Sequence, residues 1–162
     1  EIGGGRVVGE ACHLADLAVY LCASPIVAVC MNTLGGGGKG GDENAILLLR
    51  LADGSQAAVH YFSKGSSAYP KERVEIFGGG RTLVIDNWRR LEGYGFGRFR
   101  SAGSRQDKGH AEEGRQLARW LKEGGTPPGD FEAALNVTEA MLAAHESLTS
   151  GHWVEVSVPS HP

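Results

Sequence analysis

The stretch GGGRVVGEACHLADL at residues 3–17 decides the fold, because three glycines lead directly into a segment with helical spacing. Apolar side chains recur at the helical period along this stretch and just beyond it, at Leu14, Leu17 and Leu21. A helix with such a stripe packs one face on a sheet and leaves the other face polar. The sequence predicts this helix over residues 9–23, ended by Pro25, which disfavours helix in the residue before it.

Titratable side chains occupy a second stripe of the same predicted helix, at Glu10, His13, Asp16 and Tyr20. At α-helical spacing these residues share one flank. One interpretation is a solvated helix edge with an ion pair between residues three apart, which contributes a few tenths of a kcal/mol. The other is an imidazole held by a carboxylate and ready to exchange a proton with a substrate hydroxyl. The spacing alone leaves both open.

The composition limits the class of protein and of partner. The chain has 162 residues, 41% hydrophobic and 22% charged, with a net charge of −3 and no run of lysine or arginine. These values are typical of one soluble globular domain and argue against nucleic acid or an anionic membrane as a partner. No apolar run approaches the ~20 residues that span a bilayer. Cys12, Cys22 and Cys30 are odd in number and lie in apolar stretches, which predicts reduced thiols and a cytoplasmic location.

The rest of the chain predicts a run of strands followed by two helices and a last strand. Strands are expected at residues 26–34, 45–51, 56–62, 72–77, 82–86 and 153–158, and helices at 107–123 and 130–148, with irregular alternation over 88–99. Asp53-Gly54 predicts a hairpin turn, and Asp107 and Asp130 are predicted N-caps. This order predicts an α+β fold with a mostly antiparallel sheet backed by helices.

Three other patterns could indicate a binding or catalytic site. The glycine run at 35–41 contains Lys39 but leads into a strand, which excludes a phosphate loop. Cys12 and His13 diverge on a helix and cannot form a nucleophile–base pair. Lys108 and His110 lie at a predicted helix start, where they either hold a substrate oxygen or anion or belong to an ordinary helix end.

Several segments together resemble one enzyme family. Residues 3–5 and 9–17 look like the second-domain signature of the Gfo/Idh/MocA oxidoreductases, the glucose-fructose oxidoreductase and inositol dehydrogenase group. Residues 69–80 and 106–110 look like a subgroup in which this module follows a zinc-type alcohol dehydrogenase-like portion. The segments at 127–132 and 146–148 agree with that subgroup.

The resemblance implies an NAD(P)-dependent enzyme that acts on a sugar, cyclitol or sugar derivative. Residues 1–162 would form a single substrate-binding and oligomerisation domain, a homodimer or higher homo-oligomer. The N-terminal Rossmann domain that binds NAD or NADP is expected to be absent from this chain, since no G-x-G-x-x-G unit occurs in it between a predicted strand and a predicted helix. The isolated chain is therefore expected to be inactive.

The resemblance also implies roles for residues. His13 matches the family histidine that contacts the reacting hydroxyl and moves its proton, while hydride passes between the nicotinamide and the carbinol carbon. The family carries an aspartate four residues earlier, where this chain has Gly9, so Glu10 takes the carboxylate role one position later. Asp16 matches a frequent family acid and is expected to bind substrate.

Two other functions remain open at this stage. A non-catalytic sheet module for dimerisation or ligand binding is favoured by Gly9 and disfavoured by His13 and Lys108. A metal-dependent hydrolase would use Glu10 and His13, although no histidine pairs with cysteines or acids at the spacing of a structural zinc site.

Overall fold

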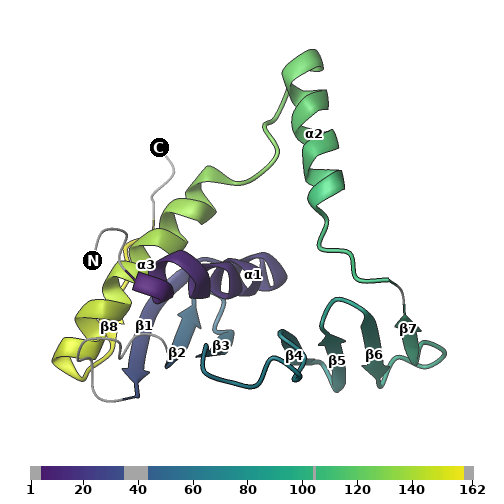
Figure 1. Ribbon diagram of the computed structural model, residues 1–162. Helices are drawn as coiled ribbons and strands as arrows, with labels where there is room; N and C mark the ends of the chain where they lie inside the picture. The colour runs from purple at the N-terminus through teal and green to yellow at the C-terminus, as the bar shows by residue number, and fades with distance from the viewer. Residues whose placement is uncertain (1–4, 35–43, 104, 159–162) are drawn as a thin grey trace. The chain divides into compact units, whose positions relative to one another are not determined.

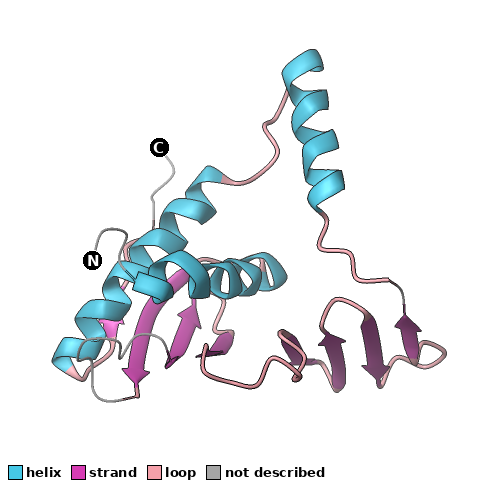
Figure 2. Ribbon diagram, in the orientation of Figure 1, coloured by secondary structure: helices cyan, strands magenta, loops and turns pink. Residues whose placement is uncertain are grey.

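The structure is a computed structural model that describes residues 5–34, 44–103 and 105–158. The chain divides into two compact units. Residues 1–64 and 129–162 form the helix–sheet unit, and residues 65–128 form the meander unit. Figure 1 labels their elements and Figure 2 colours them by type. Every strand pair is antiparallel, which confirms the predicted α+β class.

The helix–sheet unit contains a four-stranded sheet with the order β3-β2-β1-β8. Its strands are β1 (Ile26–Thr33), β2 (Asn44–Leu51), β3 (Gln56–Phe62) and β8 (Val154–Glu155). Its helical elements are the π turn η1 (Val7–Ala11), α1 (Cys12–Cys22) and α3 (Phe131–Ser150). The predicted hairpin at Asp53-Gly54 joins β2 to β3, and Gly54 has the positive φ of 89° that such a turn requires. The predicted last strand is shortened to two residues.

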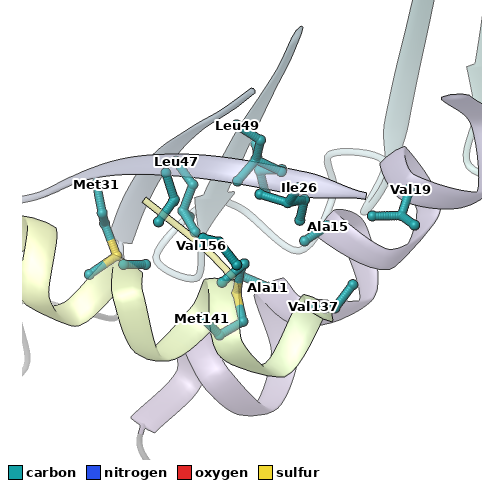
Figure 3. Close-up of a cluster of buried hydrophobic side chains, with 14 of the residues drawn as sticks. Ala11, Ala15, Val19, Ile26, Met31, Leu47, Leu49, Val137, Met141 and Val156 are labelled. Carbon is teal, nitrogen blue, oxygen red and sulfur yellow. The ribbon is translucent and has the colours of Figure 1, made fainter. Parts of the chain in front are cut away.

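The core lies between this sheet and its helices. Along β2, Ala45, Leu47, Leu49 and Leu51 are buried on one face, while Ile46 and Leu48 on the other face are 37% and 43% exposed. Figure 3 shows buried side chains of β1 and β2 meeting those of α1 and α3. Helices therefore cover one face of the sheet, as predicted, and the other face is open.

Two buried polar side chains of α3 complete the hydrogen bonding of β1. The Asn136 Oδ1 accepts from the Ile26 N–H at 2.8 Å, and its Nδ2 donates to the Ile26 carbonyl at 2.9 Å. The Ser147 hydroxyl accepts from the Met31 N–H at 3.1 Å and donates to the His152 carbonyl at 2.6 Å. The eleven-residue step from Asn136 to Ser147 in a helix and the five-residue step from Ile26 to Met31 in a strand both span roughly 16 Å, so both side chains can reach β1.

The shortness of β8 explains why α3 must supply these partners. β8 pairs only with Ala28 and Val29 of β1, so the β1 edge continues past it in both directions. A buried backbone N–H or carbonyl without a hydrogen-bond partner destabilises the fold. On either side of β8, Asn136 bonds to the backbone of Ile26 and Ser147 bonds to the backbone of Met31.

The ends of α3 follow local rules. Asp130 Oδ1 accepts from the N–H groups of Glu132 and Ala133 at 3.0 and 3.1 Å, which confirms the predicted N-cap. Gly151 ends the helix with a φ of 72°, as a left-handed C-terminal glycine does.

The meander unit contains four strands that are neighbours in chain order: β4 (Arg73–Gly78), β5 (Arg81–Asp86), β6 (Arg90–Tyr94) and β7 (Ser101–Gly103). The irregular segment predicted at 88–99 is the β5–β6 turn, β6 and the start of the next hairpin. A larger residue at Gly93 would force the Phe99 ring to move, because a Cβ would lie 2.6 Å from that ring.

The last element of this unit is α2 (His110–Glu123), in which every residue except Trp120 is exposed. The predicted start at Asp107 is wrong. Gly109 occupies the N-cap with a φ of 81°, and no side chain caps the helix. Asp107 instead accepts from the Gly109 N–H at 2.8 Å, which forms a local turn before the helix. Among the described helices, none is both long and apolar enough to cross a bilayer.

Candidate functional site

The α1 flank, defined as His13, Asp16 and Tyr20, is the strongest candidate site. α1 is regular from Cys12 onward, so residues three and seven positions after His13 lie on the same side of the helix. All three side chains are exposed, and Tyr20 is 79% exposed. Meanwhile Ala15 and Val19 point into the core. The helix therefore presents the titratable stripe, as the sequence predicts, but the predicted packing stripe is wrong: Leu14 only borders the core, and Leu21 is 42% exposed.

Glu10 stands differently from the rest of the predicted stripe. It lies in η1, where hydrogen bonds run from residue i to i+5 and each turn takes more residues than in an α-helix. The α-helical spacing that aligned Glu10 with His13 does not apply across this turn. Val7, Val8 and Gly9 of this turn have low helix propensity, but nothing in the sequence specifies a π turn.

The carboxylates and imidazole of this region have no partner within the described residues. Glu10, His13 and Asp16 are exposed, and none makes a hydrogen bond or ion pair to another described residue. Their polar atoms are thus available to an incoming ligand. An imidazole and a carboxylate on one helix flank can bind adjacent hydroxyls and move a proton.

Cys12 is a poor nucleophile beside this flank. Burial is the largest influence on its thiol and raises its pKa, and the charges of Asp16 and Glu10 raise the pKa further, against backbone hydrogen bonds that lower it. A raised pKa keeps the thiol protonated. All three cysteines are half-buried. Among residues 5–34, 44–103 and 105–158, no three metal-ligating side chains gather into one group.

The second predicted cluster lies in the meander unit and is already engaged. Lys108 Nζ lies 2.5 Å from Glu72 Oε1, whereas His110 is 82% exposed and 3.9 Å from Glu113 Oε2. Lys108 and His110 belong to the meander unit, whereas the α1 flank belongs to the helix–sheet unit.

Sequence reasoning missed Glu72 and Trp88. The Trp88 indole donates to Glu72 Oε2, so the same carboxylate receives both Trp88 and Lys108. Lys108 is 36 positions along the chain from Glu72, and no local pattern marks a pair that distant. Asn87 was the available sequence signal for this turn, because asparagine tolerates the left-handed conformation that it adopts there.

The stability of the meander unit is expected to fall in acid because of Glu72. Burial is the largest single influence and raises its pKa, but hydrogen bonds from Lys108 and Trp88 outweigh it and hold the pKa below the ordinary value. A lowered pKa stabilises the fold above the unfolded glutamate pKa of about 4.3, and this contribution is lost as the pH falls through the folded pKa. Urea unfolding of wild type and Glu72→Gln between pH 6 and pH 3 measures it.

In that comparison, wild type should lose stability more steeply than Glu72→Gln below the ordinary glutamate pKa. Parallel pH curves for the two proteins would contradict a stabilising charge at Glu72.

One pocket of about 580 Å³ is formed along β6 and the hairpin that leads to β7. Its lining includes Arg90, Glu92, Tyr94, Phe96, Phe99 and Arg100. None of the predicted site residues lines it.

The described strands offer no dinucleotide site. Such sites form at the carboxyl ends of parallel strands joined by βαβ crossovers, and every described strand pair is antiparallel. The described residues of this chain therefore do not form a Rossmann-type site for NAD or NADP.

Comparisons with known proteins agree with the fold and the sequence resemblance. The family model described as the GFO/IDH/MocA C-terminal domain matches residues 1–84. No curated protein matches the sequence. Levoglucosan dehydrogenase in its apo form is similar in structure, with a TM-score of 0.75 and 20% identity over 98% of this chain and 52% of that one.

Two further solved structures are similar at the same level. An oxidoreductase from Agrobacterium radiobacter, in complex with NAD⁺, L-tartaric acid and magnesium, has a TM-score of 0.72 and 19% identity over 90% of this chain and 47% of that one. An NAD binding oxidoreductase from Klebsiella pneumoniae has a TM-score of 0.72 and 16% identity over 90% and 49%. The chain spans about half the length of these structures.

The helix-backed antiparallel sheet and the family match together define a C-terminal domain of the oxidoreductase class. The chain belongs to the GFO/IDH/MocA family, because the model of that family's C-terminal domain matches residues 1–84 of the 162.

Proposed function

We propose that this chain is the substrate-binding domain of an NAD(P)-dependent oxidoreductase that acts on a sugar, a cyclitol or a sugar derivative. The observation that carries the proposal is the exposed His13, without a partner among the described residues, on the same helix flank as Asp16. The two compact units act as one substrate domain. The dinucleotide binds a Rossmann domain outside this chain, in a longer protein that includes a zinc-type alcohol dehydrogenase-like portion.

Each candidate residue has a proposed role. His13 accepts or returns the proton of the reacting hydroxyl, Asp16 binds a neighbouring hydroxyl, and Glu10 is the proposed second carboxylate of the site. His110 is exposed and is a proposed substrate contact. Lys108 already pairs with Glu72, so a substrate anion would have to compete with that carboxylate. Free thiols are consistent with a cytoplasmic enzyme.

A titration followed by ¹⁵N–¹H NMR tests substrate binding without requiring turnover. Sugars, sugar acids and cyclitols are added separately to the protein, and the amide shifts of the α1 flank are followed. The proposal expects at least one polyol to move the signals of His13 and Asp16 in a saturable way. A panel that leaves all α1 signals in place would contradict substrate binding on this helix.

The alternative is a module of the same fold without catalysis. It is favoured by Gly9, which stands where the family carries an aspartate. Such a module would bind a polyol or dimerise, and the assembled protein would not oxidise or reduce that polyol. Turnover by the assembled protein separates the two functions.

We also propose that the open sheet face joins two copies of the chain. The outer face, on the side of the sheet away from α1 and α3, carries Cys30, Ile46, Leu48, Ala58, His60 and Phe62. Phe62 is 56% exposed, and its ring meets His60 edge-on at 5.9 Å. The same face also carries exposed Asn32, Arg50 and Gln56, so apolar side chains lie among polar ones, as they do in interfaces between protein chains.

Leu48→Glu is expected to convert this dimer to a monomer, because it places a charge at the centre of the outer face. Light scattering coupled to size exclusion measures the mass against the 17.1 kDa chain. The matched control is Leu142→Glu, since Leu142 is 60% exposed on α3, on the opposite side of the sheet. A wild-type monomer, or a dimer that Leu48→Glu leaves intact, would contradict the proposed interface.

A further inference from the structure

The β5–β6 turn contains an unusual backbone. Arg89 N–H donates to the Asp86 carbonyl at 2.9 Å and closes a turn whose central residues, Asn87 and Trp88, have φ values of 48° and 54°. Asparagine tolerates this left-handed region, but a bulky residue such as tryptophan is disfavoured there. A residue in this conformation persists only where its surroundings hold it.

Glu72 holds the turn from the strand β4 side. Its carbonyl accepts from the Asn87 N–H at 2.8 Å, and its carboxylate accepts from the Trp88 indole. The Glu72 side chain is 21% exposed, so its hydrogen bonds are partly shielded from water. One residue thus binds both the backbone and the side chain of the strained pair.

The segment that leads into α2 binds the same turn at two points. Lys108 Nζ donates to the Glu72 carboxylate at 2.5 Å, and Gln106 Nε2 lies 2.9 Å from the Asn87 carbonyl and 3.2 Å from its Oδ1. Gly109, the N-cap of α2, follows Lys108 directly. The turn therefore fixes the chain at the point where α2 begins.

We propose that Glu72, Trp88 and Lys108 form a latch that keeps the strained turn closed and fixes the start of α2. Lys108 is then a positioning residue and does not bind a substrate anion. The latch orders residues 105–109 by joining them to a turn between two strands. This inference concerns the meander unit and does not depend on the substrate proposed for the α1 flank.

Hydrogen exchange followed by NMR on the whole chain tests the latch. Lys108→Met should accelerate exchange of the Trp88 indole N–H, the Asn87 amide and the Glu112 amide by about tenfold, because the carboxylate loses one of its two donors. The Trp120 indole, which donates to the Gly125 carbonyl at 3.1 Å, is an internal reference that should not change. Glu75→Gln is the matched control. It breaks the exposed Arg73–Glu75 ion pair in β4, the strand that directly follows Glu72.

Making Lys108→Met in a second protein, the Trp88→Gly variant, distinguishes a latch from a simple ion pair. Trp88→Gly removes the strain at position 88, because glycine adopts positive φ freely, and it also removes the indole donor to Glu72. The latch predicts that Lys108→Met accelerates Asn87 exchange in the wild-type background and leaves it unchanged in Trp88→Gly. Equal acceleration in both backgrounds, or none in either, would overturn the proposal, as would an equal effect of Glu75→Gln.

Discussion

Replacing His13 with alanine in the full-length oxidoreductase is expected to lower kcat by about 10²- to 10⁴-fold, the usual contribution of a positioned acid or base. The proposed step is exchange of a proton between the imidazole and the reacting hydroxyl, and alanine cannot perform it. The side chain is exposed and makes no contact that the fold needs, so stability should change by less than about 0.5 kcal/mol. Steady-state kinetics and urea unfolding of the same preparation measure both quantities.

His152→Ala provides the matched control for this variant. His152 is also an exposed histidine, but its ring contacts only the Ser150 carbonyl in the turn before β8. Its loss should leave kcat near the wild-type value. If His13→Ala and His152→Ala have the same kcat, His13 does not carry the chemistry proposed for it.

Among the variants proposed here, Asn136→Ala is expected to lower the free energy of unfolding the most, by about 3 kcal/mol. Asn136 is 1% exposed and satisfies both the N–H and the carbonyl of Ile26 at 2.8 and 2.9 Å. Alanine would leave both backbone groups buried without partners, at roughly 1–3 kcal/mol each. Because this bond joins α3 to β1 across 110 positions, its loss should loosen the helix–sheet unit as a whole. Urea unfolding followed by circular dichroism measures the change.

Thr138→Ala tests whether the removal of any polar side chain from α3 lowers stability by a similar amount. Thr138 is exposed, and its hydroxyl bonds only to the Ala134 carbonyl one turn earlier in the same helix. Its replacement should change stability by less than about 0.5 kcal/mol. An Asn136→Ala variant as stable as Thr138→Ala would mean that the Ile26 groups find other partners.

Local signals predicted much of the fold. The hairpin at Asp53-Gly54, the Asp130 cap and the end of α2 at Gly124 depend on residues within a few positions of each other, and all are confirmed. The start of α2 was missed because Gly109 takes a left-handed conformation and interrupts the helix that Asp107 would cap.

Long-range features were beyond sequence reasoning. The short β8 and the pairing of Asn136 and Ser147 with β1 join residues more than 100 positions apart. The latch likewise joins Glu72 to Lys108 across 36 positions. His13 and Asp16 could be predicted because they share a regular helix, whereas the relation of Glu10 to His13 depends on the π turn at η1.

The central claim is that this domain presents a polyol to an oxidoreductase through His13. Its most direct test is polyol-dependent reduction of NAD⁺ or NADP⁺ by the full-length protein, with wild type and His13→Ala assayed side by side. The account predicts reduction with at least one sugar or cyclitol, lowered by at least about 100-fold in the variant. Absence of polyol-dependent reduction in a preparation that binds the dinucleotide, or equal rates in the two proteins, would contradict it.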